Sequence, residues 1–254
     1  MSTILVIGDV QGTAVWKKII EKHRGEFDMV VFLGNYFGSS IIPPVNQIKN
    51  FYNILNLKKN NLFKAEFLIG HNDFHYLKNS TDMYDYYNSE IHFLLQDELN
   101  IQIKMGNLKI AYAYVNMLFS HSGITNTFYY DLTHKKIDID FYKGFHIDTV
   151  LNMTLQNKPH VYNLYANQLY HNEPFSKHAD NKYHSPLCVH KNSLIKDVYT
   201  GYTQIVCDPL IKNPRFVKYE HTEILFNCPS FNLNYLMIEQ ANNLTTRKFK
   251  VLSL

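Results

Sequence analysis

Residues 4–12 read ILVIGDVQG: four apolar residues, then a polar turn with a glycine on either side. A short apolar run bounded by such a turn is typical of a strand buried on both faces. The pattern returns at residues 29–35 (MVVFLGN) and 67–71 (FLIGH), and helical spacing lies between, at 13–21 and 45–55. This strand–helix alternation predicts βαβ units and a sheet covered on both faces.

Polar side chains stand where each of these three strands ends. Asp9 follows the first strand, Asn35 the second and His71 the third, and a glycine precedes each of them. Ligands of such sheets bind at the carboxyl ends of the strands. The three strand ends therefore indicate a site along one edge of the sheet.

The middle of the chain predicts a helix and then three strands. Helical spacing covers residues 88–99, and strand-like patterns follow at 101–104, 108–115 and 117–120. The turn at 105–107 contains a glycine and suits a hairpin between the first two of these strands.

A looser region, rich in His, Asn and Tyr, spans about residues 125–195. Five strand-like patterns follow it, at residues 197–202, 216–219, 223–227, 235–238 and 249–254. We therefore expect a single domain over residues 1–254, in which 125–195 form an insertion or a lid.

The composition describes a globular chain with little net charge. Of its 254 residues 46% are hydrophobic and 19% charged, the formal net charge is +3, and 13 residues are histidines. The arginines are Arg24, Arg215 and Arg247, and no Lys/Arg cluster forms a stripe. Because arginine is the usual residue for bidentate phosphate contacts, we do not expect extended nucleic-acid binding.

Two features bear on the compartment. No apolar run approaches the roughly 20 residues that span a membrane, and the N-terminus lacks the basic region of a secretory signal. The cysteines Cys188, Cys207 and Cys228 are odd in number and widely spaced, which fits a reducing compartment. We expect a cytoplasmic protein without a membrane partner.

Five short segments, taken in chain order, resemble the motifs of the calcineurin-like metallophosphoesterases. The family reads Asp-x-His-Gly, Gly-Asp-x-x-Asp-Arg-Gly, Gly-Asn-His-Asp/Glu, Ser-His-x-Gly, and Gly-His-Thr or Gly-His-x-His. The corresponding segments here are GDVQG (8–12), GNYFG (34–38), GHND (70–73), SHSG (120–123) and GYTQ (201–204). The resemblance implies an α+β fold with four layers, α/β/β/α, in which helices flank a central β-sandwich.

The family holds two divalent metals, and the resemblance places seven residues at ligand positions: Asp9, Gln11, Asn35, His71, His121, Tyr202 and Gln204. Asp9 and His121 keep the family residue. Asn35 replaces the bridging aspartate, His71 stands where the family has asparagine, and Gln11, Tyr202 and Gln204 put an amide or a phenol where it has histidine. The metal-binding motifs are therefore degenerate.

The third motif has its two central residues exchanged, so that His71 precedes Asn72. Asn72 then stands where the family's histidine protonates the leaving group. An amide has no titratable proton near neutral pH, so Asn72 cannot act as a general acid. His75 could replace that histidine only if its ring reached the site.

Electrostatics disfavours a dinuclear centre without the bridging carboxylate. Two divalent ions about 3.5 Å apart repel by about 19 kcal/mol at an effective dielectric constant of 20. We therefore expect no metal cofactor. A second interpretation stays open, in which one divalent metal (Mn, Fe or Zn) binds Asp9, His71 and His121.

Simpler interpretations stand beside these. Asp9 could cap the following helix, and His121 could be a hydrogen-bonded core histidine. Gln11, Asn35 and Gln204 could hydrogen-bond one another and fill a former metal cavity. Gly34 and Gly70 could be ordinary turn glycines.

The middle region holds seven histidines whose spacing matches no standard zinc pattern: His134, His146, His160, His171, His178, His184 and His190. The segment SPLCVH (185–190) resembles a family segment that often reads Ser-Pro-Leu-Trp-Val-Arg. By that resemblance His190 stands for an arginine that contacts substrate phosphate. A new metal site at Cys188 and His190 is a further hypothesis.

Together these features favour a pseudoenzyme, which binds a protein or a small molecule through a relic pocket. The alternative is an active phosphatase with a rebuilt, mononuclear site, acting on a phosphoprotein or a nucleotide-type phosphoester.

Overall fold

The computed structural model describes residues 1–59, 62–77, 87–163, 181–219, 222–241 and 246–254. Within these ranges the strands form two mixed sheets. The first contains, in order, β11 (Arg247–Ser253), β10 (Asn234–Gln240), β1 (Ser2–Ile7), β2 (Met29–Phe32), β3 (Lys64–Leu68) and β4 (Leu108–Lys109). Strands β1 to β4 run parallel to one another, whereas β10 is antiparallel to both β1 and β11.

The second sheet contains, in order, β5 (Ala111–Tyr114), β6 (Met117–Ser120), β7 (Thr203–Cys207), β9 (Thr222–Asn227) and β8 (Arg215–Tyr219). Its three central strands β6, β7 and β9 are parallel, and each edge strand is antiparallel to its neighbour. Both sheets therefore have parallel strands whose carboxyl ends can carry a site.

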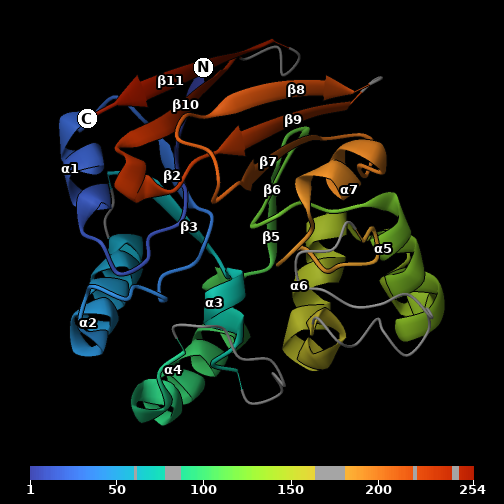
Figure 1. Cartoon of the computed structure of the whole chain (residues 1–254). Helices are drawn as coiled ribbons and strands as arrows, with labels where there is room; N and C mark the ends of the chain where they lie inside the picture. The colour runs from blue at the N-terminus through green and yellow to red at the C-terminus, as the bar shows by residue number, and fades with distance from the viewer. Residues whose placement is uncertain (60–61, 78–86, 164–180, 220–221, 242–245) are drawn as a thin grey trace.

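Helices flank the pair of sheets (Figure 1). On one side lie α1 (Val15–Lys22) and α2 (Pro44–Leu55), and on the other lie α5 (Asn126–Asp131), α6 (Ile147–Asn157) and α7 (Lys191–Lys196). Helices α3 (His71–Phe74) and α4 (His92–Lys104) follow β3. The remaining turns are 3₁₀ helices at Asn56–Lys59, Ser89–Ile91, Ile139–Tyr142, Pro159–Tyr162 and Ser230–Asn232, and a π-helix at Leu132–Lys136.

The alternation of side chains along each strand builds the layers. In β1, Ile4 and Val6 belong to the core between the sheets, whereas Leu5 and Ile7 belong to the core under the helices. In β7, Cys207 faces the core between the sheets and Val206 packs in the cluster that includes α7. This arrangement confirms the predicted α+β fold class, a central β-sandwich flanked by helices.

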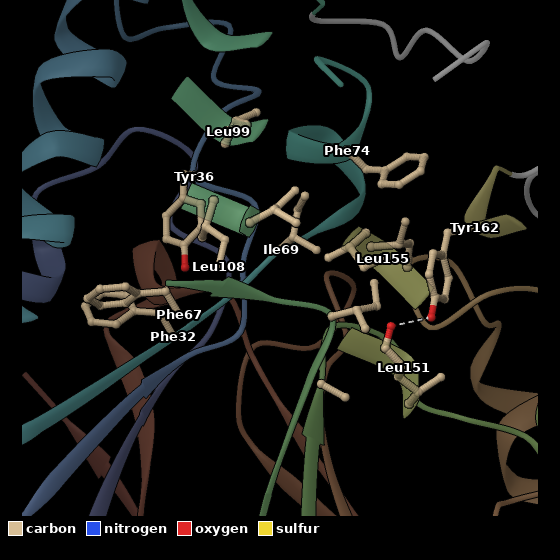
Figure 2. Close-up of a cluster of buried hydrophobic side chains, with 14 of the residues drawn as sticks. Phe32, Tyr36, Phe67, Ile69, Phe74, Leu99, Leu108, Leu151, Leu155 and Tyr162 are labelled. Carbon is tan, nitrogen blue, oxygen red and sulfur yellow. Dashed lines mark hydrogen bonds between the residues drawn. The ribbon is translucent and has the colours of Figure 1, made fainter. Parts of the chain in front are cut away.

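The largest core continues from the first sheet into the middle region. Figure 2 shows Leu99 of α4 in the same cluster as Leu151 and Leu155 of α6. The Tyr162 hydroxyl donates a 2.8 Å hydrogen bond to the Leu151 carbonyl, which ties the 3₁₀ helix Pro159–Tyr162 to α6. The division into one domain with an insertion at 125–195 stays a prediction.

Two predicted strands are wrong. Residues 101–104 form the last turn of α4, because Leu95, Leu99 and Ile103 continue a buried helical stripe. The turn at 105–107 is therefore the end of this helix and no hairpin. Residues 197–202 contain one isolated bridge at Val198, and the buried strand β7 begins directly after them.

None of the helices in the described ranges is both long and apolar enough to cross a membrane.

Candidate functional site

A pocket of about 520 Å³ opens at the carboxyl ends of the parallel strands. The loops after β1, β2 and β3 of the first sheet line it, together with those after β6 and β7 of the second. It brings together these residues inferred from the sequence: Asp9, Gln11, Asn35, His71, Asn72, His121 and His190.

Two glycines let the loops after β2 and β3 meet. A Cβ atom on Gly34, whose φ is +102°, would lie 2.4 Å from the Gly70 backbone nitrogen. A Cβ atom on Gly70 would lie 2.2 Å from the Asn35 nitrogen. These glycines are therefore required by close backbone approach, beyond what an ordinary turn demands.

Two residues of the pocket adopt left-handed backbone conformations that are uncommon for side chains larger than hydrogen. The φ angle is +45° at Gln11 and +51° at Asn35, and the Gln11 N–H donates a 2.7 Å hydrogen bond to the Asn35 carbonyl. Such conformations persist where the surrounding structure holds them, and they concentrate at functional sites.

Asp9 is fully buried and pairs with Asn35. The Asn35 side-chain N–H donates a 2.9 Å hydrogen bond to Asp9 Oδ2, and Asn35 Oδ1 accepts one of 2.9 Å from the Asn72 N–H. Asp9 does not cap the next helix, because α1 begins at Val15 with Ala14 at the N-cap position. Of the simpler interpretations, the helix-cap role is thus wrong.

His121 is also buried, and its ring connects the two sheets. Nδ1 lies 2.8 Å from the Leu33 carbonyl oxygen and 3.7 Å from Asp9 Oδ1. Because a carbonyl can only accept, we place a proton on Nδ1, which donates it to the Leu33 carbonyl. The neutral ring then carries its lone pair on Nε2.

The polar groups of the loop after β3 mainly hold the loop after β2. The Asn72 amide donates a 3.2 Å hydrogen bond to the Phe37 carbonyl, and the rings of His71 and His75 lie 4.4 Å apart. His75 is buried and does not line the pocket. Asp73 accepts hydrogen bonds from three backbone N–H groups, and its burial raises its pKa to about 7.

Two residues expected in the pocket lie elsewhere. Gln204 is fully buried and pairs with the Ile124 backbone, accepting from its N–H at 2.8 Å and donating to its carbonyl at 2.7 Å. The Tyr202 hydroxyl lies 2.7 Å from Nε2 of His146. Tyr202 directly precedes β7 and Gln204 is its second residue, whereas the pocket lies at the carboxyl end of this strand.

Cys207 and Asp208, which the sequence analysis missed, line the pocket at that carboxyl end. The signal was the apolar run Ile205–Cys207 followed by an aspartate, the same pattern as at Asp9. Asp208 is 6% exposed, and its Oδ1 accepts a 3.0 Å hydrogen bond from the Leu210 N–H. Burial raises the pKa of the Cys207 thiol well above its ordinary value, so this thiol is not poised as a thiolate nucleophile.

The histidines of the middle region are mostly apart from the pocket. His190 lines it, His146 contacts Tyr202, and His134 stacks on Tyr130. His171 and His178 lie outside the described residues. In the part of the chain that the structure describes, no three His, Cys, Asp or Glu side chains form a group that could hold a metal ion.

No protein-family model matches this chain, and no curated protein matches its sequence. Its fold is similar to solved structures. A cold-active protein-tyrosine phosphatase of a psychrophile, Shewanella sp., is 10% identical with a TM-score of 0.53, over 98% of this chain and 80% of that chain. A metallophosphoesterase from Sphaerobacter thermophilus is 10% identical with a TM-score of 0.45, over 99% of this chain and 88% of that chain. At these identities the likeness concerns the fold alone.

Proposed function

We propose that this chain is a binding protein built on a phosphoesterase fold, and that it has lost dinuclear-metal hydrolysis. The observation that carries the proposal is the hydrogen bond from Asn35 to Asp9. A bridging ligand must offer lone pairs to two cations, whereas the Asn35 amide directs an N–H group at the neighbouring carboxylate.

The remaining donor set does not fit two metals either. The Gln204 amide is hydrogen-bonded to the Ile124 backbone, and the Tyr202 hydroxyl lies beside His146. Of the seven inferred ligand positions, those that line the pocket keep one carboxylate, Asp9, and two imidazoles, His71 and His121.

Within the described residues, the position at which the family places the leaving-group histidine carries no general acid. The Asn72 amide has no titratable proton and is hydrogen-bonded to the Phe37 carbonyl. The volume of about 520 Å³ is instead in the range of pockets that bind small molecules or an inserted side chain.

Metal analysis of the purified chain, followed by calorimetric titration with Mn²⁺, tests the proposal. We expect less than one metal ion per ten chains and no saturable Mn²⁺ binding. Two Mn²⁺ ions bound per chain, with affinity lost in Asp9→Asn, would contradict it. An Asp97→Asn variant, altered on the exposed face of α4, controls for nonspecific binding by carboxylates.

A further inference from the structure

Two carboxylates in the pocket wall each retain one oxygen without a hydrogen-bond donor. Asp9 is 0% and Asp208 is 6% exposed, and both residues line the pocket. Within the described residues, Asp9 Oδ1 and Asp208 Oδ2 are buried and accept no hydrogen bond. Buried polar atoms normally have a partner, so these two oxygens point to a ligand that donates.

Asn35 and His121 do not supply that donor to Asp9, and Cys207, which interacts with the Asp9 carboxylate, offers a thiol, which is only a weak donor. The Asn35 amide donates to the other oxygen, Oδ2, at 2.9 Å. His121 Nδ1 is 3.7 Å from Oδ1, and its proton points to the Leu33 carbonyl at 2.8 Å. At Asp208 the Leu210 N–H likewise donates to Oδ1 and leaves Oδ2.

Beside neutral polar side chains such as those of Gln11 and Ser122, the wall carries an apolar surface and a positively charged residue, Lys191. Leu187, Val189 and Phe226 are buried wall residues, and they offer a surface for an aliphatic chain. Lys191 and His190 stand on the same wall and are half-buried, so solvent screens the charge of Lys191 more than it screens the buried carboxylates.

We infer that the pocket binds an organic ammonium group carried on a short apolar chain. This inference rests on the proposed function, because it assigns a ligand to the relic site. An ammonium group presents three N–H donors and no acceptor, which matches two buried carboxylate oxygens. A phosphate or carboxylate ligand would bring a like charge against both aspartates.

Three probes of equal chain length isolate the charge: n-butylammonium, n-butanol and butyrate, titrated by calorimetry at pH 7. The amine is protonated at this pH, because alkylammonium groups titrate near 10.4. We expect one butylammonium per chain, bound at least tenfold more tightly than either other probe. Equal affinity for butylammonium and butanol would overturn the inference.

Asp208→Asn and Asp9→Asn test the two carboxylates separately. Each should weaken butylammonium binding at least tenfold, whereas the exposed control Asp97→Asn should leave it unchanged. Circular dichroism checks the fold, and Asp208→Asn should raise the midpoint of thermal unfolding without a probe, because it removes a buried, unpaired charge. Unchanged affinity in a folded Asp208→Asn variant would overturn the inference.

A fourth probe, lysine capped at both its amino and carboxyl groups, distinguishes the sources of the ammonium group. If capped lysine binds at least as tightly as butylammonium, the ligand is a lysine side chain of a partner protein. If butylammonium binds and capped lysine does not, the ligand is a free amine. Absence of amine selectivity together with absence of metal binding would refute this inference alone, whereas metal-dependent turnover would refute the proposed function.

Discussion

The side-chain amide of Asn35 donates a 2.9 Å hydrogen bond to the Asp9 carboxylate across the ends of β1 and β2. A backbone hydrogen bond supports this contact, because the Gln11 N–H donates to the Asn35 carbonyl at 2.7 Å. The amide thus satisfies one oxygen of a buried carboxylate within the chain itself. It also occupies the position at which the expected family carries a negatively charged bridge.

Asn35→Asp should restore that negative charge and destabilise the protein. The variant replaces a donor by a second buried carboxylate, and a hydrogen bond to a charged group contributes about 1.5–3 kcal/mol. We expect the free energy of unfolding at pH 7 to fall by at least that amount in urea denaturation. The loss should shrink at pH 4, where one of the two carboxyl groups binds a proton.

The exposed residue Asn192 on α7 offers a matched Asn→Asp control. Asn192→Asp should change the free energy of unfolding by less than about 0.5 kcal/mol. Equal effects of the two variants would show that Asn35 is not a partner of the Asp9 charge.

Gln11 and Gln204 occupy equivalent positions in the motifs, but the structure gives them different surroundings. Gln204→Ala should lower the free energy of unfolding by about 1–3 kcal/mol, because it leaves the buried Ile124 N–H unsatisfied, whereas the Ile124 carbonyl still accepts a 2.9 Å hydrogen bond from the Tyr199 N–H. Gln11→Ala should cost less than about 1 kcal/mol, because Gln11 lines the open pocket. Thermal and urea denaturation of both variants check this, and a reversed order would contradict the assignment.

Gly34→Ala should be more harmful than its backbone angle alone requires. Gly34 and Gly201 have similar φ angles, +102° and +90°, but a Cβ meets the Gly70 backbone at 2.4 Å in the first case and nothing within 4 Å in the second. Gly201→Ala should therefore cost about 1–2 kcal/mol for the left-handed conformation. Gly34→Ala should cost about 1–3 kcal/mol more, from overpacking. Equal losses in urea denaturation would show that the loops after β2 and β3 can separate freely.

Glu66, in the middle of β3, gives a pH-dependent prediction. Burial raises the pKa of Glu66, but hydrogen bonds and charges from Lys109 (2.7 Å) and Lys64 (2.9 Å) outweigh burial and lower it from 4.5. A folded-state pKa below the unfolded value means that this contribution is present above about pH 4.5 and is lost as the pH falls through the folded value.

Glu66→Gln should consequently lower the free energy of unfolding by about 1–2 kcal/mol at pH 7. The difference from the wild type should shrink steadily below pH 4.5, as measured by urea denaturation between pH 3 and pH 7. A constant difference across this range would contradict the ion-pair interpretation.

The layered fold could be predicted because the strand and helix periods are strong in this chain. Buried runs such as the one before Asp9 define the strands, and their alternation with helices predicts a sheet covered on both faces, whereas the sandwich was implied by the family resemblance. The strand at 101–104 was mispredicted because two isoleucines spaced by two residues fit a strand as well as a helix. Burial of Leu95, Leu99 and Ile103 along one helical stripe decides between them.

The site could be predicted where a motif coincided with a strand end, as at Asp9, Asn35 and His121. The prediction failed at Gly201–Gln204, because a short motif match was given more weight than the position of the strand. Gln204 and Tyr202 lie before or at the beginning of β7, and Asp208 follows its carboxyl end. The direction of the strand, which a motif match does not contain, determines which residues reach the pocket.

Turnover of para-nitrophenyl phosphate in the presence of Mn²⁺ tests most directly whether this chain has lost phosphoester hydrolysis. The purified wild type and His121→Ala should release nitrophenol at the same rate, equal to that of buffer with Mn²⁺ alone. Mn²⁺-dependent turnover by the wild type that disappears in a folded His121→Ala variant would contradict the account.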